Sequence, residues 1–262
     1  MTTDYQPFDS DAWHGVCRAD FAVPENDDLD NWLATIGATA GRRYASRWVA
    51  APTETCPWFV KLLVSASDSD SLINRLKWRF RSSRMLHTWR ISQELLAAGF
   101  GCPEIQLAAR KRAWCPFGWP TDVLVTSPVP GRQVHELLKT QPPAEVLAAV
   151  AAELARFHAA GFAHGDCIPG NLFLEDNSRL AFIDNDRTMR THAWDKWPRI
   201  RRNLVQFAFH LLRRNLVSRD QAQEFLVQYV QHAQWPPDLA KRELPKIWQW
   251  TDRRLATERP PT

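Results

Sequence analysis

The most constraining feature of this sequence is a short polar motif in the middle of the chain, His-Gly-Asp-x-x-Pro-x-Asn over residues 164–171. A strongly amphipathic segment, residues 142–160, precedes it, and two short apolar runs, 172–174 and 180–183, follow it. Asp184 stands at the end of the second run, thirteen residues after Asn171. This pattern predicts a loop between a long helix and a small hairpin, with polar side chains at fixed spacing.

The spacing matches the protein-kinase signature H-R-D-L-x-x-x-N, which is followed by a metal-binding Asp. Phosphoryl transfer requires alignment of the reactants and charge neutralisation. Asp166 is therefore predicted to be the catalytic base, and Asn171 and Asp184 to be oxygen ligands of Mg²⁺ on the ATP phosphates. The alternative is that all three are turn or cap residues, because Asp and Asn favour turns. The helix before the motif and the hairpin after it favour the kinase interpretation.

Two upstream residues complete the predicted nucleotide site. Lys61 is the single charge in the strand-like run of residues 58–64 and is predicted to contact the α- and β-phosphates of ATP. The alternative is an exposed lysine on an edge strand. Kinases pair this lysine with a helix glutamate, and Glu94, the only acid in residues 72–102, is assigned to that role. A solvent-facing glutamate is the alternative for Glu94.

The order of the predicted elements indicates an α+β, two-lobed, protein-kinase-like fold with a small β-rich N-lobe and a mainly helical C-lobe. We predict one kinase-like domain, residues 1–262, with an N-lobe over 1–127 and a C-lobe over 128–262 that carries the catalytic loop. Residues 1–30 are predicted to be an irregular, acidic lead-in. The expected strands are 44–49, 58–64 and 123–126, and the expected helices are 72–98, 142–160, 199–214, 218–233 and 238–257.

Composition is that of an ordinary globular protein, with 45% apolar and 24% charged residues. The five cysteines form no CxxC pair, which favours a reducing cytoplasm over a disulfide framework. The first residues lack the basic start and apolar run of a signal peptide. We therefore expect a cytoplasmic protein that could lie against a membrane.

Several departures argue against an ordinary protein kinase. Gly165 replaces the arginine that ties the catalytic loop to a phosphorylated activation loop, and Ile168 replaces the lysine usual in Ser/Thr kinases. The segment after Asp184 lacks A-P-E, so it offers little platform for a peptide. Gly37 and Gly41 do not form G-x-G-x-x-G and give only a weak signal for a nucleotide-covering loop. The H-G-D form favours kinases of small molecules and sugars.

Taken together, the runs "WFVKLL", "HTWRISQELLAAGFGCPE", "HGDCIPGN" and "FIDNDR" resemble the lipopolysaccharide core kinases, which phosphorylate Kdo or heptose sugars. The similarity covers about residues 40–235. It implies an ATP-dependent kinase acting on a sugar hydroxyl of the inner core or a related glycolipid, with Lys61, Asp166, Asn171 and Asp184 in the roles given above. Many members carry an acid immediately before the Trp of the helix, where this chain has Thr88.

A basic and aromatic segment, residues 75–84, supports an anionic or membrane-associated acceptor, since arginines and aromatic rings together suit a headgroup interface. Together with the resemblance, it implies possible peripheral contact with the cytoplasmic face of the inner membrane. A solvated basic helix face is the alternative, and nucleic acid is not expected because the net charge is only +4. Two other functions remain open. One is a soluble kinase of the aminoglycoside or choline type, and the other is a pseudokinase that serves as a scaffold.

Overall fold

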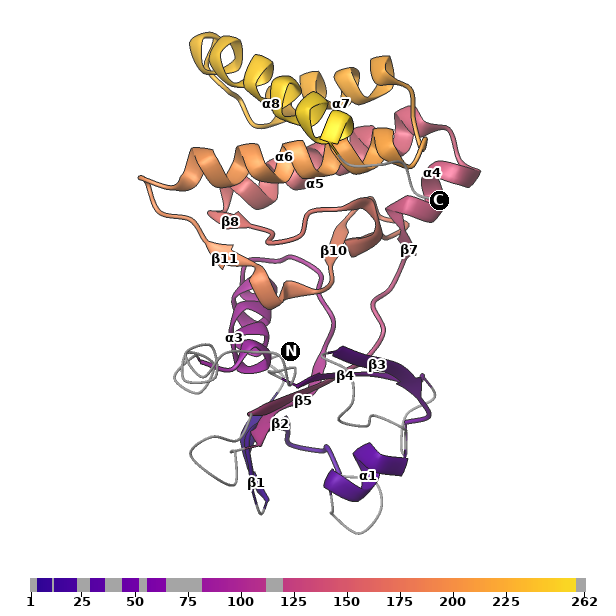
Figure 1. Cartoon of the computed structure of the whole chain (residues 1–262), viewed down its shortest axis with the longest axis vertical. Coiled ribbons are helices and arrows are strands. Elements are labelled where there is room, and N and C mark those ends of the chain that lie inside the picture. The colour runs from indigo at the N-terminus through magenta and orange to yellow at the C-terminus, as the bar shows by residue number, and fades with distance from the viewer. Residues whose placement is uncertain are drawn as a thin grey trace. The chain divides into compact units, whose positions relative to one another are not determined.

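The structure, a computed structural model, describes residues 4–10, 12–22, 29–35, 44–51, 56–64, 82–111 and 120–257. The chain divides into two compact units, each with its own internal packing (Figure 1). Unit 1 comprises residues 1–93 and 103–128, and unit 2 comprises residues 94–102 and 129–262. An antiparallel sheet forms most of unit 1 and helices form most of unit 2, which confirms the predicted α+β class. The predicted lobe boundary at residue 127 stays a prediction.

Unit 1 contains a six-stranded antiparallel sheet in the order β1-β2-β5-β6-β4-β3. The predicted strands 44–49 and 58–64 are confirmed, and the third begins two residues earlier than predicted. The strands are β1 Tyr5–Ser10, β2 Trp13–Arg18, β3 Tyr44–Val49, β4 Trp58–Val64, β5 Ile105–Lys111 and β6 Thr121–Thr126. Strand β5 was not predicted, although its residues 105–109 are buried.

The irregular lead-in predicted for residues 1–30 is wrong. Strands β1 and β2 form a hairpin, and β2 pairs with β5. Side chains on alternate positions of a strand share one face, and Trp13 and Cys17 are both buried on the same face of β2. Burial of this face explains why the segment forms a strand of the sheet. Gly15 lies between them, and a Cβ there would stand 2.0 Å from the backbone oxygen of Ala108. The absence of a side chain at Gly15 therefore allows the close approach of β2 to β5.

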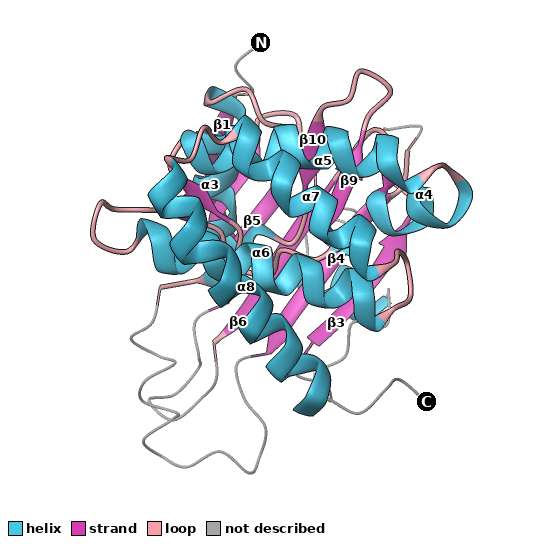
Figure 2. Ribbon diagram, turned by 90° about the horizontal axis from the view of Figure 1, so that it is seen from above, coloured by secondary structure: helices cyan, strands magenta, loops and turns pink. Residues whose placement is uncertain are grey.

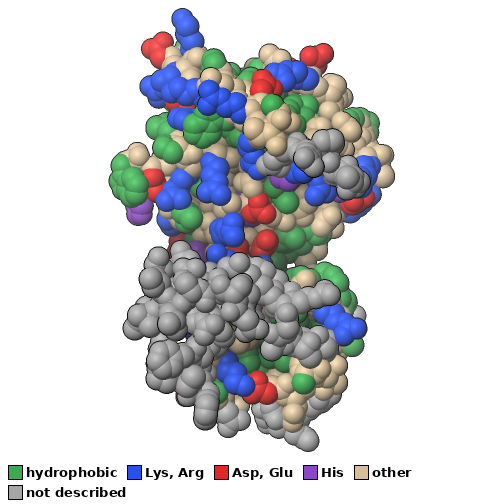
Figure 3. Space-filling view, in the orientation of Figure 1, with side chains coloured by type: hydrophobic (Ala, Val, Ile, Leu, Met, Phe, Trp, Pro, Cys, Tyr) green, Lys and Arg blue, Asp and Glu red, His purple; other side chains and the backbone are tan. Residues whose placement is uncertain are grey.

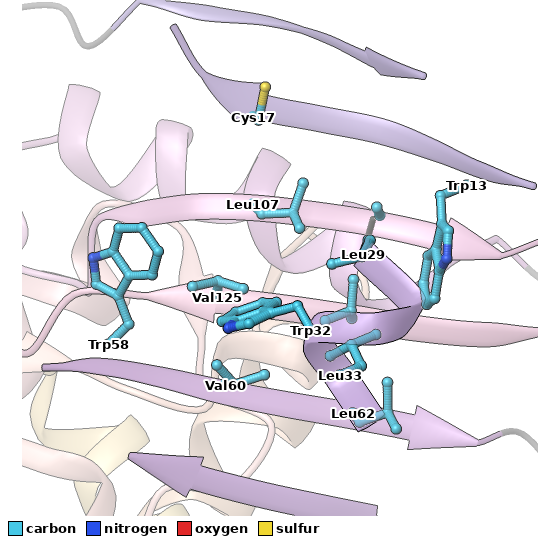
Figure 4. Packing of buried hydrophobic residues seen from close by; sticks show 12 residues of the cluster. Trp13, Cys17, Leu29, Trp32, Leu33, Trp58, Val60, Leu62, Leu107 and Val125 are labelled. Carbon is cyan, nitrogen blue, oxygen red and sulfur yellow. The ribbon is translucent and has the colours of Figure 1, made fainter. Parts of the chain in front are cut away.

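The two faces of the sheet are covered by different helices. Helix α1 (Leu29–Thr35) packs Leu29, Trp32 and Leu33 on the face formed by Val60 and Leu62 (Figure 4). Helix α3 (Arg84–Ala97) packs Met85 on the opposite face, against Leu63, Ile105 and Leu124. Side chains alternate along a strand, so Lys61 shares the α3 face with Leu63.

Helix α3 accounts for the second part of the predicted helix 72–98, while residues 72–81 lie outside the described residues. It begins at a serine cap, since the Ser83 hydroxyl accepts a hydrogen bond from the backbone N–H of Leu86 at 3.2 Å. It ends before Gly99, whose φ is +75°.

In the described part of unit 2, four long α-helices and one short α-helix pack beside one another (Figure 2). They are α4 Val134–Thr140, α5 Pro143–Ala159, α6 Lys196–Arg213, α7 Arg219–His232 and α8 Pro237–Thr257. The four long helices lie within a few residues of their predicted bounds, whereas α4 was not predicted. The described part of unit 2 also contains two small sheets, with the strand orders β10-β9-β7 and β11-β8. Along the sequence, these strands fall between the helices. The strands of the two sheets are β7 Arg132–Gln133, β8 Phe162–Ala163, β9 Leu172–Leu174, β10 Leu180–Phe182 and β11 Met189–Arg190.

The core of unit 2 fixes the ends of two strands that lead into the polar motif. The ring of Phe157 on α5 stacks on Phe182 of β10 at 4.1 Å and on Phe162 of β8 at 5.5 Å between centroids. Phe100 meets all three rings edge to face. Strand β8 ends directly before His164, and β10 ends two residues before Asp184. Because the aromatic core anchors β8 and β10, it fixes the positions at which the two polar segments begin.

Candidate active site

The polar motif forms a loop whose own amide groups bind its ends together. The side-chain N–H groups of Asn171 donate to the backbone oxygen of Asp166 at 2.9 Å and to its carboxylate Oδ2 at 3.3 Å. The backbone N–H of Ile183 donates to the carbonyl of Asn171 at 3.0 Å. Asp184 therefore follows a residue that is bonded directly to the motif. The structure brings together three of the predicted site residues, namely Asp166, Asn171 and Asp184.

His164 joins the same two segments through both ring nitrogens. Its Nδ1 accepts from the backbone N–H of Asp166 at 3.1 Å, so Nε2 carries the proton and donates to the carbonyl of Ile183 at 2.9 Å. Burial lowers the pKa of His164 and favours this neutral form, although Asp184 and Asp166 act in the opposite direction. A neutral imidazole with one defined tautomer thus fixes the spacing between the loop and the segment of Asp184.

The carboxylate of Asp166 is held by two side-chain amides. Gln206 on α6 donates from Nε2 to Oδ1, and Asn171 donates to Oδ2. The Gln206 oxygen also accepts from the backbone N–H of Cys167 at 3.2 Å. An ionised carboxylate offers about four lone-pair sites. The two hydrogen bonds from amide groups therefore orient Asp166 and leave other lone pairs able to accept a proton or a further hydrogen bond.

Below the loop lies a buried polar network that sequence reasoning missed. Asn203 on α6 accepts from the backbone N–H of His164 at 2.9 Å, and its own N–H donates to the carbonyl of His164. The same oxygen accepts from Nε2 of His158 at 3.0 Å, and Nδ1 of His158 accepts from the Tyr229 hydroxyl at 2.7 Å. Each buried polar group thereby finds a partner, which is the condition for burying it at low cost.

One signal for this network exists in the sequence. Asn203 and Gln206 are three residues apart on an otherwise apolar helix face that includes Ile200, Leu204 and Phe207. Both are buried. Polar side chains at helical spacing on a buried face require buried partners. The sequence could have shown that partners were needed, but not which backbone groups supply them.

Gly165 is required by a close approach of two chain segments. A Cβ at Gly165 would stand 2.0 Å from the Cβ of Arg187 and 2.5 Å from its carbonyl oxygen. Arg187 ends the short 3-10 helix of residues 185–187 that follows Asp184. The glycine that departs from the protein-kinase pattern therefore lets the Asp184 segment lie directly on the loop of residues 164–171.

Asp184 has a left-handed backbone conformation, with φ 57° and ψ 48°. Asp and Asn adopt this region more readily than most residues, but it still carries strain that the surroundings must hold. Asn185 supplies part of that support, because its amide donates to the Phe182 carbonyl at 2.7 Å and its oxygen accepts from Thr188 at 3.0 Å. The hydrogen bonds of Asn185 thus hold the backbone segment that carries the exposed Asp184 side chain.

Glu94 forms an ion pair with Arg190 at 2.7 Å, and both side chains are about half exposed. It belongs to unit 2, whereas Lys61 belongs to unit 1. The predicted pairing of Glu94 with Lys61 stays a prediction, and this contact lends it no support. Gly37, Gly41 and residues 75–81 lie outside the described residues.

Among the described residues, no group of three or more His, Cys, Asp and Glu side chains is arranged to hold a metal ion. None of the described helices is long and apolar enough to cross a lipid bilayer.

Comparison with known proteins identifies the family. The profile of the lipopolysaccharide kinase (Kdo/WaaP) family matches residues 67–229, more than half of the chain. The protein belongs to that family. It is therefore an ATP-dependent phosphotransferase with an alcohol group as acceptor, as predicted. No curated protein matches the sequence significantly.

Several solved structures are similar to this chain. The structure described as WaaP in complex with acyl carrier protein is 17% identical over 86% of this chain and 91% of that chain, with a TM-score of 0.57. WbdD is 16% identical over 80% of this chain and 50% of its own, with a TM-score of 0.46. A divergent Toxoplasma kinase lacking the glycine-rich loop is 12% identical over 89% of this chain and 91% of that chain, with a TM-score of 0.46. The WaaP similarity shows a kinase-like fold.

The contact between Gly165 and Arg187 gives a first prediction. Gly165→Ala should lower the free energy of unfolding by about 1–3 kcal/mol, because the new methyl group has no space. Phosphoryl transfer should fall as well. Gly170→Ala is the matched control in the same loop, since a Cβ there meets nothing within 4 Å. Urea unfolding measures both variants, and equal stability of the two would contradict the steric argument.

The buried histidines predict how stability depends on pH. Burial lowers the pKa of His158 to about 4, from about 6.5 in an unfolded chain. Below pH 6.5 the unfolded chain binds the proton first, so stability is complete above that pH and is lost toward pH 4. The loss should approach about 1.4 kcal/mol per pH unit for each buried histidine. His164 acts in the same direction.

Urea unfolding at several pH values between 5 and 7.5 tests this dependence. His158→Gln retains a donor and an acceptor but does not titrate, so its stability should fall less steeply with decreasing pH than that of the wild type. Identical slopes would show that His158 is not the group responsible.

Proposed function

We propose that this protein phosphorylates a sugar hydroxyl of the lipopolysaccharide inner core, on Kdo or heptose, or of a related glycolipid. The observation that carries the proposal is the Asp166 carboxylate, which Gln206 and Asn171 hold in one orientation. The family to which the chain belongs supports the sugar acceptor. A pre-oriented carboxylate is what a kinase needs to position an acceptor hydroxyl, and it is not needed by a scaffold.

In the proposed reaction, Asp166 accepts the proton of the acceptor hydroxyl as that oxygen attacks the γ-phosphorus of ATP. The bond between the γ-phosphorus and the bridging oxygen of ADP breaks, and ADP leaves with the electron pair. The hydrogen bonds from Asn171 and Gln206 keep the carboxylate in place, and its remaining lone pairs are available to the acceptor hydroxyl. Lys61 is proposed to contact the α- and β-phosphates, and Glu94 remains the proposed acidic residue of the nucleotide site.

Asn171 and Asp184 are proposed as the magnesium ligands. The side-chain oxygen of Asn171 has no hydrogen-bond partner among the described residues, because both hydrogen bonds of this side chain are donated by its nitrogen. Two oxygen donors fit magnesium, which usually binds one or two protein ligands and completes its shell with phosphates and water. When bound, the ion would neutralise phosphate charge.

Asp166→Asn tests the proposed base. The substitution keeps the shape and removes the negative charge and the proton acceptor, so transfer should fall by about 10²–10⁴. Binding of magnesium-ATP should persist, because Lys61, Asn171 and Asp184 are unchanged. Calorimetry of ATP binding and phosphate transfer to purified core oligosaccharide are the paired measurements.

The control is Lys61→Ala, which should weaken ATP binding as well as transfer. Near wild-type transfer by Asp166→Asn would refute the base assignment. A wild-type protein that binds ATP but phosphorylates no core acceptor would favour the pseudokinase scaffold. In cells, loss of the gene should remove one phosphate from the lipopolysaccharide, as measured by mass spectrometry.

We also propose peripheral contact with an anionic membrane surface. In unit 2, Trp194 is 79% exposed, and its ring stacks on His192. Lys196 follows, with Nζ 5.5 Å from the ring centroid of Trp197. An exposed aromatic ring in a segment that also carries a cation suits the headgroup region. On the face in Figure 3, basic side chains are scattered among apolar ones over the helices of unit 2.

Binding to vesicles that contain anionic lipid tests this contact. Lys196→Gln should weaken binding by about 1 kcal/mol, and added salt should weaken binding of the wild type. Trp194→Ala should reduce binding further, whereas Trp250→Ala, which removes a 40% exposed Trp on α8, is the control. Equal binding of all variants would argue for a soluble acceptor.

A further inference from the structure

Strand β10, which leads to Asp184, is held at both of its edges. It pairs with β9 along one edge. At the other edge, the backbone N–H of Leu180 donates to the carboxylate of Glu153 on α5 at 3.2 Å. The N–H of Phe182 donates to the carbonyl of Gly101 at 2.8 Å. The outer edge of the strand thus finds its acceptors in one side chain and in the loop that follows α3.

The loop after α3 lies close against this strand. Gly101 bridges to Ala181 in parallel, and a Cβ at Gly101 would stand 2.8 Å from the Cβ of Ala181. The same loop closes α3, because the N–H of Phe100 donates back to the carbonyl of Leu95 at 2.9 Å. The end of α3 and the strand that leads to Asp184 are therefore joined directly.

The carboxylate of Glu153 also binds two arginines. Arg156 donates to its two oxygens at 2.8 Å each, and Nε of Arg179 lies 3.7 Å from it. Both guanidinium groups donate in turn to the carbonyl of Gly99, at 3.3 Å from Arg156 and 2.8 Å from Arg179. One carboxylate therefore holds the β10 backbone and two cations that grip the end of α3.

The charge of Glu153 matters for this arrangement. Its side chain is only 11% exposed. Burial acts to raise the pKa of Glu153, but the hydrogen bonds from Arg156 and Leu180 and the charges of Arg156 and Arg179 outweigh it and lower the pKa. The carboxylate is therefore ionised at neutral pH. A neutral side chain would leave two guanidinium groups at one carbonyl without this negative charge beside them.

A second attachment to α3 follows Asp184 in the chain. Glu94, in the last turn of α3, pairs with Arg190 of β11 at 2.7 Å. The guanidinium carbon of Arg190 also lies 4.0 Å from the ring centroid of Phe162. Residues 183–189 are therefore bracketed, because the strand before them and the strand after them are both tied to the end of α3. All of these contacts lie within unit 2.

We propose that Glu153 is a positioning residue for magnesium binding, which fixes the place of Asp184 by holding β10 against the end of α3. This inference rests on the proposed function, in which Asp184 is a metal ligand. Strand β10 ends two residues before Asp184, so a shift of β10 displaces the carboxylate that it carries. Loss of a group that orients a metal ligand typically weakens metal binding or activity 10- to 100-fold. In this role Glu153 acts through β10 and not as a ligand.

Glu153→Gln tests the role, because it keeps the shape and an acceptor for Leu180 but removes the charge. The magnesium concentration for half-maximal transfer should rise about 10-fold, with the KM for the acceptor unchanged. Glu145→Gln is the matched control, since it removes an exposed carboxylate from the same helix. A lower melting temperature with unchanged magnesium dependence overturns the proposal, as does an equal effect of Glu145→Gln.

Arg179→Gln carries the test if Glu153→Gln does not fold. The side chain of Arg179 is half exposed, and its loss removes one of the two guanidinium bonds to Gly99. The magnesium concentration for half-maximal transfer should rise in this variant too, by a smaller factor. An unchanged value in a folded Arg179→Gln overturns the proposal.

Amide hydrogen exchange provides a readout that does not depend on activity. In Glu153→Gln, the amides of residues 99–101 and 180–184 should exchange faster than in the wild type, while those of α7 keep their rates. Equal acceleration throughout unit 2 would show a general loss of stability and would overturn the positioning role. Unchanged exchange at residues 180–184 would overturn it as well.

Calorimetry of ATP binding separates this proposal from the proposed function. If the wild type phosphorylates no core acceptor, the proposed function fails, but the role of Glu153 is still tested by titrating magnesium against ATP binding. Glu153→Gln should need about 10-fold more magnesium than the wild type and Glu145→Gln. ATP binding by the wild type that does not depend on magnesium overturns the proposal.

Discussion

The imidazole of His164 is the contact on which the polar site depends. One nitrogen accepts from the Asp166 backbone and the other donates to the carbonyl of Ile183, directly before Asp184. A protonated ring could not accept from Asp166, so the site requires a neutral histidine. Burial keeps the ring neutral by lowering the pKa of His164. Asn203 holds the residue in position through hydrogen bonds with its backbone N–H and carbonyl groups. Hydrogen bonds between neutral, buried groups thereby fix the spacing between the loop and the Asp184 segment.

Much of this site could be predicted from sequence because its chemistry is local. Asp166 and Asn171 are five residues apart in one loop, and Asp184 stands two residues after the end of the adjoining hairpin. Motif spacing therefore indicated which of these side chains would meet. Gln206 is 40 residues away from Asp166, and its contact depends on how α6 packs under the loop. No local pattern encodes that packing, although a polar residue on a buried helix face could have indicated that a hydrogen-bond partner was needed.

The fold shows the same division between local and long-range information. The amphipathic helices of unit 2 were predictable because each repeats apolar residues at helical spacing. The hairpin of β1 and β2 was missed because its strands are short, carry polar residues on the open face and include Pro7 and Gly15. Its stability comes from pairing with β5 across about ninety residues of chain, which strand propensity does not reveal.

The close approach of Gly165 to Arg187 limits which residues this position can carry. Where protein kinases have an arginine, a Cβ on residue 165 of this chain would meet the Cβ and the carbonyl oxygen of Arg187. An arginine here would require the Asp184 segment to move away from the loop of residues 164–171. The identity of residue 165 and the position of Asp184 are therefore coupled, and a larger side chain at one would displace the other.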